Sequence, residues 1–178
     1  MLNDVNLTLC TALSLAKAGV PADALTIATN TIDLQVAREV GEGHNTYISI
    51  TVTTSFVDGG GVDAGRVYFG VLMADDAALT SNVIMPISLT GGQPILYGAT
   101  GGPSGFTSGA LVAPSNTSRG TRLLLPVPPV EGSPAFRKRY MTLAMVQPNW
   151  FTGFFSAGAL SARVVVNPHQ NDEYPRVG

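Results

Sequence analysis

The stretch TYISITVTTSF, residues 46–56, decides the fold class, because apolar and polar residues alternate along it. In an extended chain, Ile48, Ile50, Val52 and Phe56 lie on one side, and most of the serines and threonines between them lie on the other. A period of two predicts a β-strand with one buried and one solvated face. That is the usual condition of a strand in an antiparallel sheet.

Strand-like segments recur on both sides of this stretch. Residues 66–74, RVYFGVLMA, are apolar on both faces and predict a central strand that is covered on both sides. Further candidate strands are 26–34, 82–89, 93–97, 121–127, 139–147 and 159–166. Helical spacing is confined to residues 11–18, which Gly19 and Pro21 end after at most two turns, and to one turn at 75–79. Seven or eight strands with Gly- and Pro-rich connections predict an all-β fold, an antiparallel β-sandwich or jelly roll.

The glycine-rich sequence GGGVDAG, residues 59–65, separates the first two of these strands. A phosphate-binding loop needs a helix after it and usually a lysine, whereas this loop is followed by a strand and has no lysine. Asp58 and Asp63 are too few for a calcium loop, which places an oxygen ligand at every second residue. We interpret the segment as the turn of a β-hairpin, where glycine reaches positive φ without steric cost.

The length of 178 residues suits one domain with a sizeable core. We expect residues 1–24 to form an N-terminal arm, 25–170 a single jelly-roll domain with 90–120 as a long Gly/Pro-rich loop insertion, and 171–178 a C-terminal tail. Cys10 is the only cysteine, which excludes an internal disulfide and a zinc site built from several cysteines.

The N-terminal sequence lacks the basic start of a signal peptide and carries Asp4 early. No stretch approaches the ~18 consecutive apolar residues of a membrane span. We therefore expect a protein that is made in the cytoplasm and stays or assembles there, without a membrane partner.

Charged residues make up 12 % of the chain, about half of the ~25 % that is typical of globular domains. Such a deficit favours a surface that is partly hidden against copies of the chain or against another protein. The alternative is a surface of uncharged polar residues. The net charge of −2 and the scattered basic residues argue against nucleic acid as a partner. The one basic cluster, residues 137–139, stands at a strand entrance, where we expect it to solvate the strand end.

Signatures of catalysis are lacking. GGPSGF, residues 101–106, resembles a nucleophile elbow but ends in Phe106 and has no strand-turn-helix context. Asp75 and Asp76 are adjacent, so on a strand they would point in opposite directions. Other polar candidates are His44 in a loop and His169, Asp172 and Glu173 in the polar C-terminal segment, where solvation is the common role of such residues. We expect no enzyme, no cofactor and no metal site.

Two segments are candidates for contact with a partner. Residues 90–120 are nearly uncharged and contain eight glycines and three prolines, and loops of this length are usually functional or disordered. Residues 148–155, PNWFTGFF, hold the only tryptophan beside three phenylalanines, and aromatic residues of this kind often anchor interfaces. Alternatively, these aromatic side chains plug the open end of the sandwich. The candidate interface residues are Tyr97, Phe106, Leu111, Trp150, Phe151, Phe154 and Phe155.

Three blocks of the chain carry a resemblance to a known family. They are TNTIDL at 29–34, the paired aspartates at 75–76 and FFSAGALSA at 154–162. With the surrounding strands, they resemble the capsid cement, or decoration, proteins of tailed bacteriophages, in particular the jelly-roll type of short-tailed Bordetella phages. The start of the chain follows the family only loosely, and the 90–120 insertion is longer and richer in glycine than the family pattern.

The resemblance implies a structural virion protein on the outer surface of an icosahedral phage head, made in the cytoplasm of the bacterial host. It implies a homodimer or homotrimer that binds the major capsid protein and stabilises contacts between its subunits, with no catalytic residue and no cofactor. We expect the arm and one contact segment to reach the shell or the next copy, so that deletion of residues 1–20 lowers binding but leaves the sandwich folded.

Two other classes of function remain open at this point. One is a carbohydrate-binding jelly roll, for instance a receptor-binding or lectin-like module of a phage particle, in which Trp150 stacks on a sugar ring. Loss of glycan binding in Trp150→Ala would distinguish it. The other is an enzyme whose carboxylates converge from distant loops, which turnover of a substrate would reveal.

Overall fold

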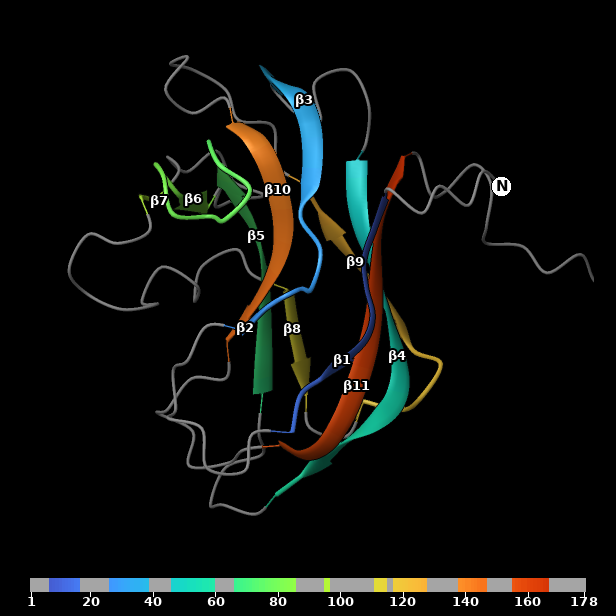
Figure 1. Ribbon diagram of the computed structural model, residues 1–178. Coiled ribbons are helices and arrows are strands. Elements are labelled where there is room, and N and C mark those ends of the chain that lie inside the picture. The colour runs from blue at the N-terminus through green and yellow to red at the C-terminus, as the bar shows by residue number, and fades with distance from the viewer. Residues whose placement is uncertain are drawn as a thin grey trace, which may run out of the picture.

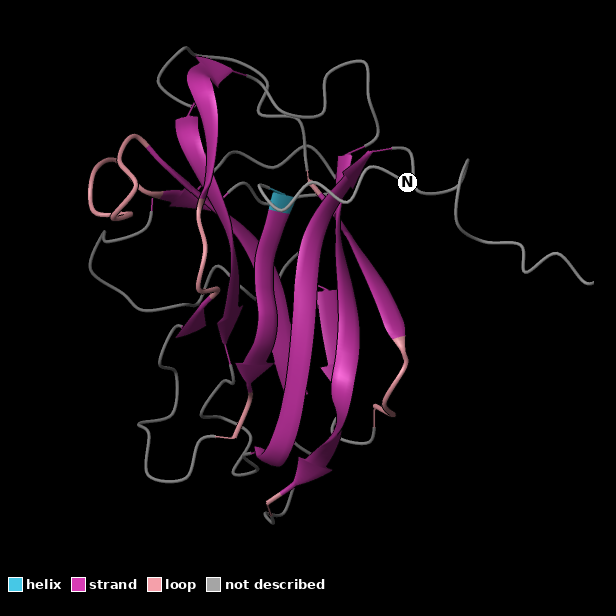
Figure 2. Ribbon diagram, turned by 45° about the vertical axis from the view of Figure 1, so that its right-hand side comes forward, coloured by secondary structure: helices cyan, strands magenta, loops and turns pink. Residues whose placement is uncertain are grey.

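The computed structural model describes residues 7–16, 26–38, 46–59, 66–85, 95–96, 111–114, 117–127, 138–146 and 155–166. Figure 2 shows strand structure through most of these residues. The strands are β1 (Thr8–Ser14), β2 (Thr26–Ile27), β3 (Ile32–Arg38), β4 (Thr46–Asp58), β5 (Arg66–Ala74), β6 (Ile84–Met85), β7 (Ile95–Leu96), β8 (Leu111–Pro114), β9 (Arg122–Pro126), β10 (Lys138–Val146) and β11 (Phe155–Val166). All pairings are antiparallel, so the predicted all-β fold is confirmed.

The strands form two sheets that face each other (Figure 1). One is four-stranded, in the order β1-β11-β4-β9. The other is seven-stranded, in the order β2-β10-β5-β6-β7, with β3 also pairing with β10 and β8 with β5. When the short strands β2, β6 and β7 are set aside, eight strands remain, in the spatial orders 1-8-3-6 and 2-7-4-5. This is the strand order of a jelly roll, so the fold is an antiparallel β-sandwich of the jelly-roll type.

The core lies between the two sheets and follows from the alternation along the strands. Ile48, Ile50 and Val52 of β4 are at most 1 % exposed and pack in the same cluster as Phe69 and Leu143 of the other sheet. Burial of such side chains stabilises the fold by about 1.5–3 kcal/mol each. The predicted inward face of residues 46–56 is therefore confirmed.

Strand β5 is buried on both faces, as its sequence predicts. Phe69 and Met73 face the main core, whereas Tyr68 and Leu72 belong to a second cluster on the opposite face of the sheet, against Val83. Strand β5 also has the bounds that the sequence predicts for it. A fully apolar strand is stable in this position because the chain itself covers the outer face.

The interpretation of residues 59–65 as a hairpin turn is wrong. A hairpin requires its two strands to pair, but β4 lies in the four-stranded sheet and β5 in the seven-stranded sheet. The segment therefore carries the chain from one sheet to the other. The apolar-polar alternation within each strand is the same whether the strands form a hairpin or lie in different sheets. The sequence pattern therefore did not distinguish the two connections.

The expected helix at residues 11–18 is also wrong within its described part. Residues 8–14 form β1, which pairs with β11 through two register shifts. Leu9 and Leu15 are at most 1 % exposed and belong to the main core. The middle of the expected N-terminal arm is thus a core strand, and deletion of residues 1–20 would remove part of the sandwich.

The predicted strand 26–34 is divided into β2 and β3 by a link between the two sheets. The Asn30 backbone N–H donates to the Leu9 carbonyl of β1 at 2.9 Å, and the Asn30 side-chain amide donates to the Thr8 carbonyl at 3.2 Å. On the other side, the Thr142 hydroxyl of β10 donates to the Asn30 carbonyl at 2.8 Å. Asn30 therefore joins one edge of the sandwich and occupies carbonyls of an edge strand that would otherwise be open to another chain.

The long insertion contains two short strands, of which the sequence predicted the first but not the second. The predicted strand 93–97 is present as β7, and β8 lies near the far end of the insertion and pairs with the start of β5. The predicted strand 82–89 corresponds to β6, within the described residues. The C-terminal tail, 171–178, lies outside the described residues.

Candidate functional site

The expected contact residues are only partly within the described chain. Leu111 begins β8, where its backbone pairs with Phe69. Phe155 begins β11. The other candidates, Tyr97, Phe106, Trp150, Phe151 and Phe154, lie outside the described residues, as do His44, His169, Asp172 and Glu173.

Phe155 belongs to the core. Its side chain is 0 % exposed, and its ring meets that of Phe56 edge to face, with 5.4 Å between the centroids. A Cβ on Gly158 would lie only 3.0 Å from Phe56 Cδ1, so glycine at this position leaves room for the ring. Phe155 is therefore a core side chain, which agrees with the alternative that the aromatic residues plug the end of the sandwich.

The two segments expected to make contacts end beside each other. The Phe56 N–H donates to the Thr117 carbonyl at 2.9 Å, just after the insertion's strand β8, and Phe155 pairs with Asp58 at the end of the aromatic segment. Val57, between them, is 47 % exposed. This end of the sandwich is one candidate contact surface. The contacts of β4 with Thr117 and with β11 bring its segments together, and the sequence alone did not reveal these contacts.

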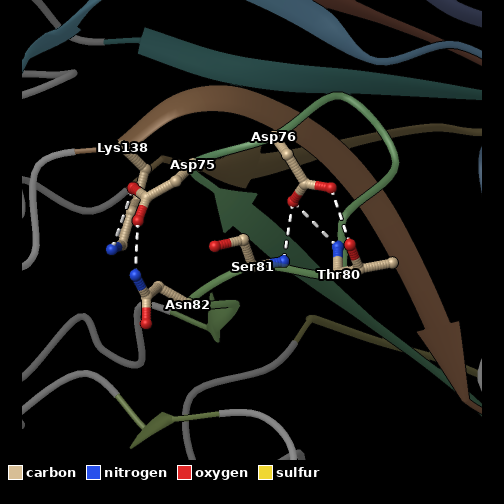
Figure 3. A network of polar contacts seen from close by, with 6 residues as sticks. All are labelled: Asp75, Asp76, Thr80, Ser81, Asn82 and Lys138. Carbon is tan, nitrogen blue, oxygen red and sulfur yellow. Dashed lines mark hydrogen bonds and ion pairs between the residues drawn. The ribbon is translucent and has the colours of Figure 1, made fainter.

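A polar network occupies the bend after β5 and the start of β10 (Figure 3). Lys138 is only 4 % exposed, and its ammonium lies 3.1 Å from the Asp75 carboxylate. The other oxygen of this carboxylate accepts a hydrogen bond from the Asn82 side-chain amide at 2.7 Å. Asp75 thus joins β10 to the residues that lead into β6. The expectation that residues 137–139 solvate a strand end does not hold for Lys138, because it is buried and ion-paired.

The neighbouring Asp76 closes the bend. Its carboxylate accepts hydrogen bonds from the Ser81 N–H at 2.7 Å, the Thr80 N–H at 2.9 Å and the Thr80 hydroxyl at 2.7 Å. These bonds, first the one from Ser81 and then the one from the Thr80 hydroxyl, lower the pKa of Asp76. Leu79 and Asn82 have φ values of 58° and 46°, which such a closed loop holds in place.

The paired aspartates therefore have structural roles. They lie in a bend, so the expectation of opposite directions on a strand does not apply, and each carboxylate is occupied by a different set of donors. The sequence analysis missed this structural role. The two aspartates directly follow a strand that is apolar on both faces, and a short polar segment in such a position often closes a turn.

A second ion pair fastens β3 to β10. The Arg139 guanidinium donates two hydrogen bonds to the Asp33 carboxylate, both at 2.8 Å. The Arg139 carbon Cζ also lies 5.1 Å from the centroid of the Tyr140 ring. The hydrogen bond to Asp33 raises the pKa of Arg139, and the charge of Asp33 adds to the effect. Both side chains are exposed, so this bidentate pair chiefly sets the register between the strands.

Cys10 is buried against β11, where its thiol lies 4.0 Å from the Leu160 carbonyl. Burial raises the pKa of this thiol to about 11. A thiolate is the reactive form, so Cys10 behaves as a small apolar core residue.

The described residues contain no group of three or more His, Cys, Asp or Glu side chains that could hold a metal ion. Within the same residues, no helix has the length and apolar character needed to cross a membrane. The contacts of Asp33, Asp75 and Asp76 are those of structural joints.

No family model matches the sequence, and no curated protein matches it. The function is therefore inferred from the residues and the fold.

Proposed function

We propose that this chain is a capsid cement (decoration) protein. It binds the outer surface of an icosahedral phage head as a homodimer or homotrimer and stabilises contacts between subunits of the major capsid protein. The observation that supports this proposal best is the position of the three blocks that resemble cement proteins. On the jelly roll, they coincide with structural joints.

The first block, 29–34, contains the link through Asn30 between the two sheets. The second, 75–76, contains the carboxylates that fasten the bend after β5 to β10. The third, 154–162, includes Phe155 and Gly158 at the closed end of the core. The shared residues thus support a common scaffold, which is where a structural protein family would retain its pattern.

The composition supports the same function. With only 12 % charged residues, a folded chain has large surfaces that lose little hydration free energy when another protein covers them. A cement protein needs broad surfaces that symmetry repeats, and it needs no catalytic group.

The test is co-sedimentation of the purified protein with shells of the source phage that lack it, followed by heating. We expect saturable binding at a fixed ratio to the major capsid protein and a higher melting temperature of the shell. A protein that stays in the supernatant at all concentrations would contradict the proposal. Glycan binding that is lost in Trp150→Ala would then favour the carbohydrate-binding alternative.

The contribution of the N-terminal segment needs a shorter deletion than residues 1–20, because β1 is part of the sandwich. Deletion of residues 1–6 leaves Leu9 and Leu15 in the core. We expect this variant to keep the melting temperature of the free protein and to bind the shell more weakly. Unchanged binding would remove the segment from the proposed contact.

A further inference from the structure

The two edges of the four-stranded sheet differ in regularity. At one edge, β1 pairs with β11 through register shifts on either side of Cys10, and Asn30 donates hydrogen bonds to the Thr8 and Leu9 carbonyls. Bulges and bonds of this kind keep an edge strand from pairing with another chain. At the other edge, β9 pairs with β4 without a register shift, and no strand of the described chain lies beyond it.

The ladder between β9 and β4 shows which backbone groups of β9 point toward the open side. The Val127 N–H donates to the Thr46 carbonyl, and the Val52 N–H donates to the Thr121 carbonyl, both at 2.9 Å. In an antiparallel ladder, every second residue of a strand bonds to the same neighbour. The odd-numbered residues of β9 therefore bond to β4, and the backbone groups of the even-numbered residues point away from it.

Leu124 lies at the centre of this open side. Its N–H and carbonyl point away from β4, and its side chain is half-buried on the outer face of the sheet, because Leu123 and Leu125 on either side pack against the core. Pro126 also has an even number, so its missing N–H costs no bond with β4, as is usual for proline on an edge strand. The centre of β9 thus presents one donor and one acceptor between leucine side chains.

The sequence of β9 is compatible with pairing to its own copy. A two-fold axis beside Leu124 would place two β9 strands side by side in opposite directions, and each Leu124 N–H would donate to the Leu124 carbonyl of the other copy. In this register, position 122 faces position 126 of the other copy. The one charged residue of β9, Arg122, therefore lies at opposite ends of the contact in the two copies and does not face itself. The two four-stranded sheets would form one continuous antiparallel sheet.

We propose that two copies of this chain pair through β9, antiparallel and centred on Leu124. The inference rests on the proposed function, in which the chain is a homo-oligomer, and it selects the homodimer, because a three-fold axis cannot pair one strand edge with itself. A second copy is favoured over a strand of another protein, since the two-fold register brings leucine onto leucine and keeps the Arg122 charges apart. The pairing also covers the backbone groups of Leu124, which an edge strand otherwise leaves open.

The first measurement is the mass of the purified protein, without shells, by sedimentation velocity between about 1 μM and about 100 μM. We expect a dimer. For Leu124→Lys, the Kd of the dimer should rise at least about tenfold, because the two-fold axis brings the two new charges together. The matched control is Val165→Lys, which adds the same charge to the same outer face but on β11, an interior strand of the sheet. The control should leave the dimer unchanged.

A cysteine variant tests the register itself. Residues that face each other in a hydrogen-bonded antiparallel pair have Cα atoms about 5.5 Å apart, within the range of a disulfide. We expect Leu124→Cys to become a disulfide-linked dimer under mild oxidation, and Val165→Cys to stay unlinked on a non-reducing gel. Leu124→Cys adds no charge and keeps the ladder with β4, so it tests the pairing even if Leu124→Lys does not fold.

A monomer at every concentration or a trimer would overturn the inference. A dimer that Leu124→Lys and Val165→Lys weaken equally would also overturn it, as would a dimer that Leu124→Cys does not cross-link. Shell co-sedimentation tests the proposed function separately. A dimer linked through β9 that stays in the supernatant would contradict the cement function and leave the pairing standing. A monomer that saturates the shell would support the cement function and overturn the pairing.

Discussion

The Lys138 ammonium lies 3.1 Å from the Asp75 carboxylate, although only 4 % of the lysine side chain is exposed and 39 % of the aspartate side chain is. The pair therefore has one buried and one solvated member. A buried ammonium is costly without an acceptor, whereas a carboxylate at the surface can be hydrated by water. The loss of folding free energy should accordingly depend on which of the two residues is replaced.

We expect Asp75→Ala to destabilise the protein by about 2–3 kcal/mol, because it leaves the buried ammonium of Lys138 without its carboxylate. Lys138→Met should cost less, because it removes the charge and keeps the apolar stem. Urea unfolding followed by circular dichroism measures both. The exposed pair is the comparison: Asp33→Asn should have a smaller effect than Asp75→Ala. A larger loss in Lys138→Met than in Asp75→Ala would contradict this account.

Substitution of two glycines with positive φ distinguishes the cost of backbone strain from the cost of a steric clash. A Cβ added to Gly120 (φ 89°) would have no atom within 4 Å, whereas a Cβ added to Gly158 (φ 150°) would lie 3.0 Å from Phe56 Cδ1. We expect Gly120→Ala to cost about 1 kcal/mol of stability and Gly158→Ala about 1–2 kcal/mol more. Thermal unfolding of the two variants tests the order. Equal losses would mean that Phe56 moves away at no cost.

The strands were predictable where the alternation was long and the local period was unbroken. Residues 46–56 and 66–74 correspond to β4 and β5, and the apolar pattern of each shows which faces are buried. The segment around β1 also has a period of two, at Leu7, Leu9, Leu13 and Leu15, but the register shifts on either side of Cys10 and the burial of Cys10 itself interrupt it. The small residues and leucines that follow favour a helix locally, and pairing with β11 overrides that preference.

The connections were not predictable, because a period of two shows that a segment is a strand but not which strand it pairs with. For the same reason, a glycine-rich link at 59–65 fits both a hairpin and a crossing between sheets. The same limit applies to side-chain contacts between strands. Arg122 of β9 donates a hydrogen bond to Ser49 of β4, and Arg163 of β11 pairs with the same serine, although these residues are far apart in the sequence.

The buried thiol predicts a loss of stability in alkali. Burial raises the pKa of Cys10 from about 9 to about 11, so the folded state keeps a proton that the unfolded state releases. The contribution of the protonated thiol to the free energy of unfolding is complete below pH 9. It is lost as the pH rises to 11, by up to about 2–3 kcal/mol. Cys10→Ala should be less stable at pH 7 but should lack this component of the pH dependence. The free energies of unfolding of the wild type and of Cys10→Ala are compared between pH 8 and pH 11. If both fall by the same amount, the thiol is not the cause.

The same burial predicts slow alkylation of Cys10. At pH 8, the folded protein should react with iodoacetamide far more slowly than the unfolded protein, since the thiol is both protonated and covered by β11. Mass spectrometry after timed quenching measures the rate. Reaction at the rate of a model thiol would show that β1 separates readily from β11, and the edge strand would then be open to other chains.

Asp76 predicts a loosening of the bend in acid. Its pKa is lowered by hydrogen bonds in the folded state, so its contribution to stability is present above its ordinary pKa of 3.8 and is lost as the pH falls through the folded value. Asp76→Ala should show the same loosening at pH 7, seen as faster hydrogen exchange at the Thr80 and Ser81 amides that Asp76 accepts from. Asp76→Asn keeps one acceptor oxygen and should be intermediate. Exchange at the Leu143 and Leu160 amides, in core strands, serves as the internal control and should not change. If exchange at Thr80 and Ser81 is unaffected in Asp76→Ala, the bend is held by other contacts, such as those of Asp75 with Lys138 and Asn82.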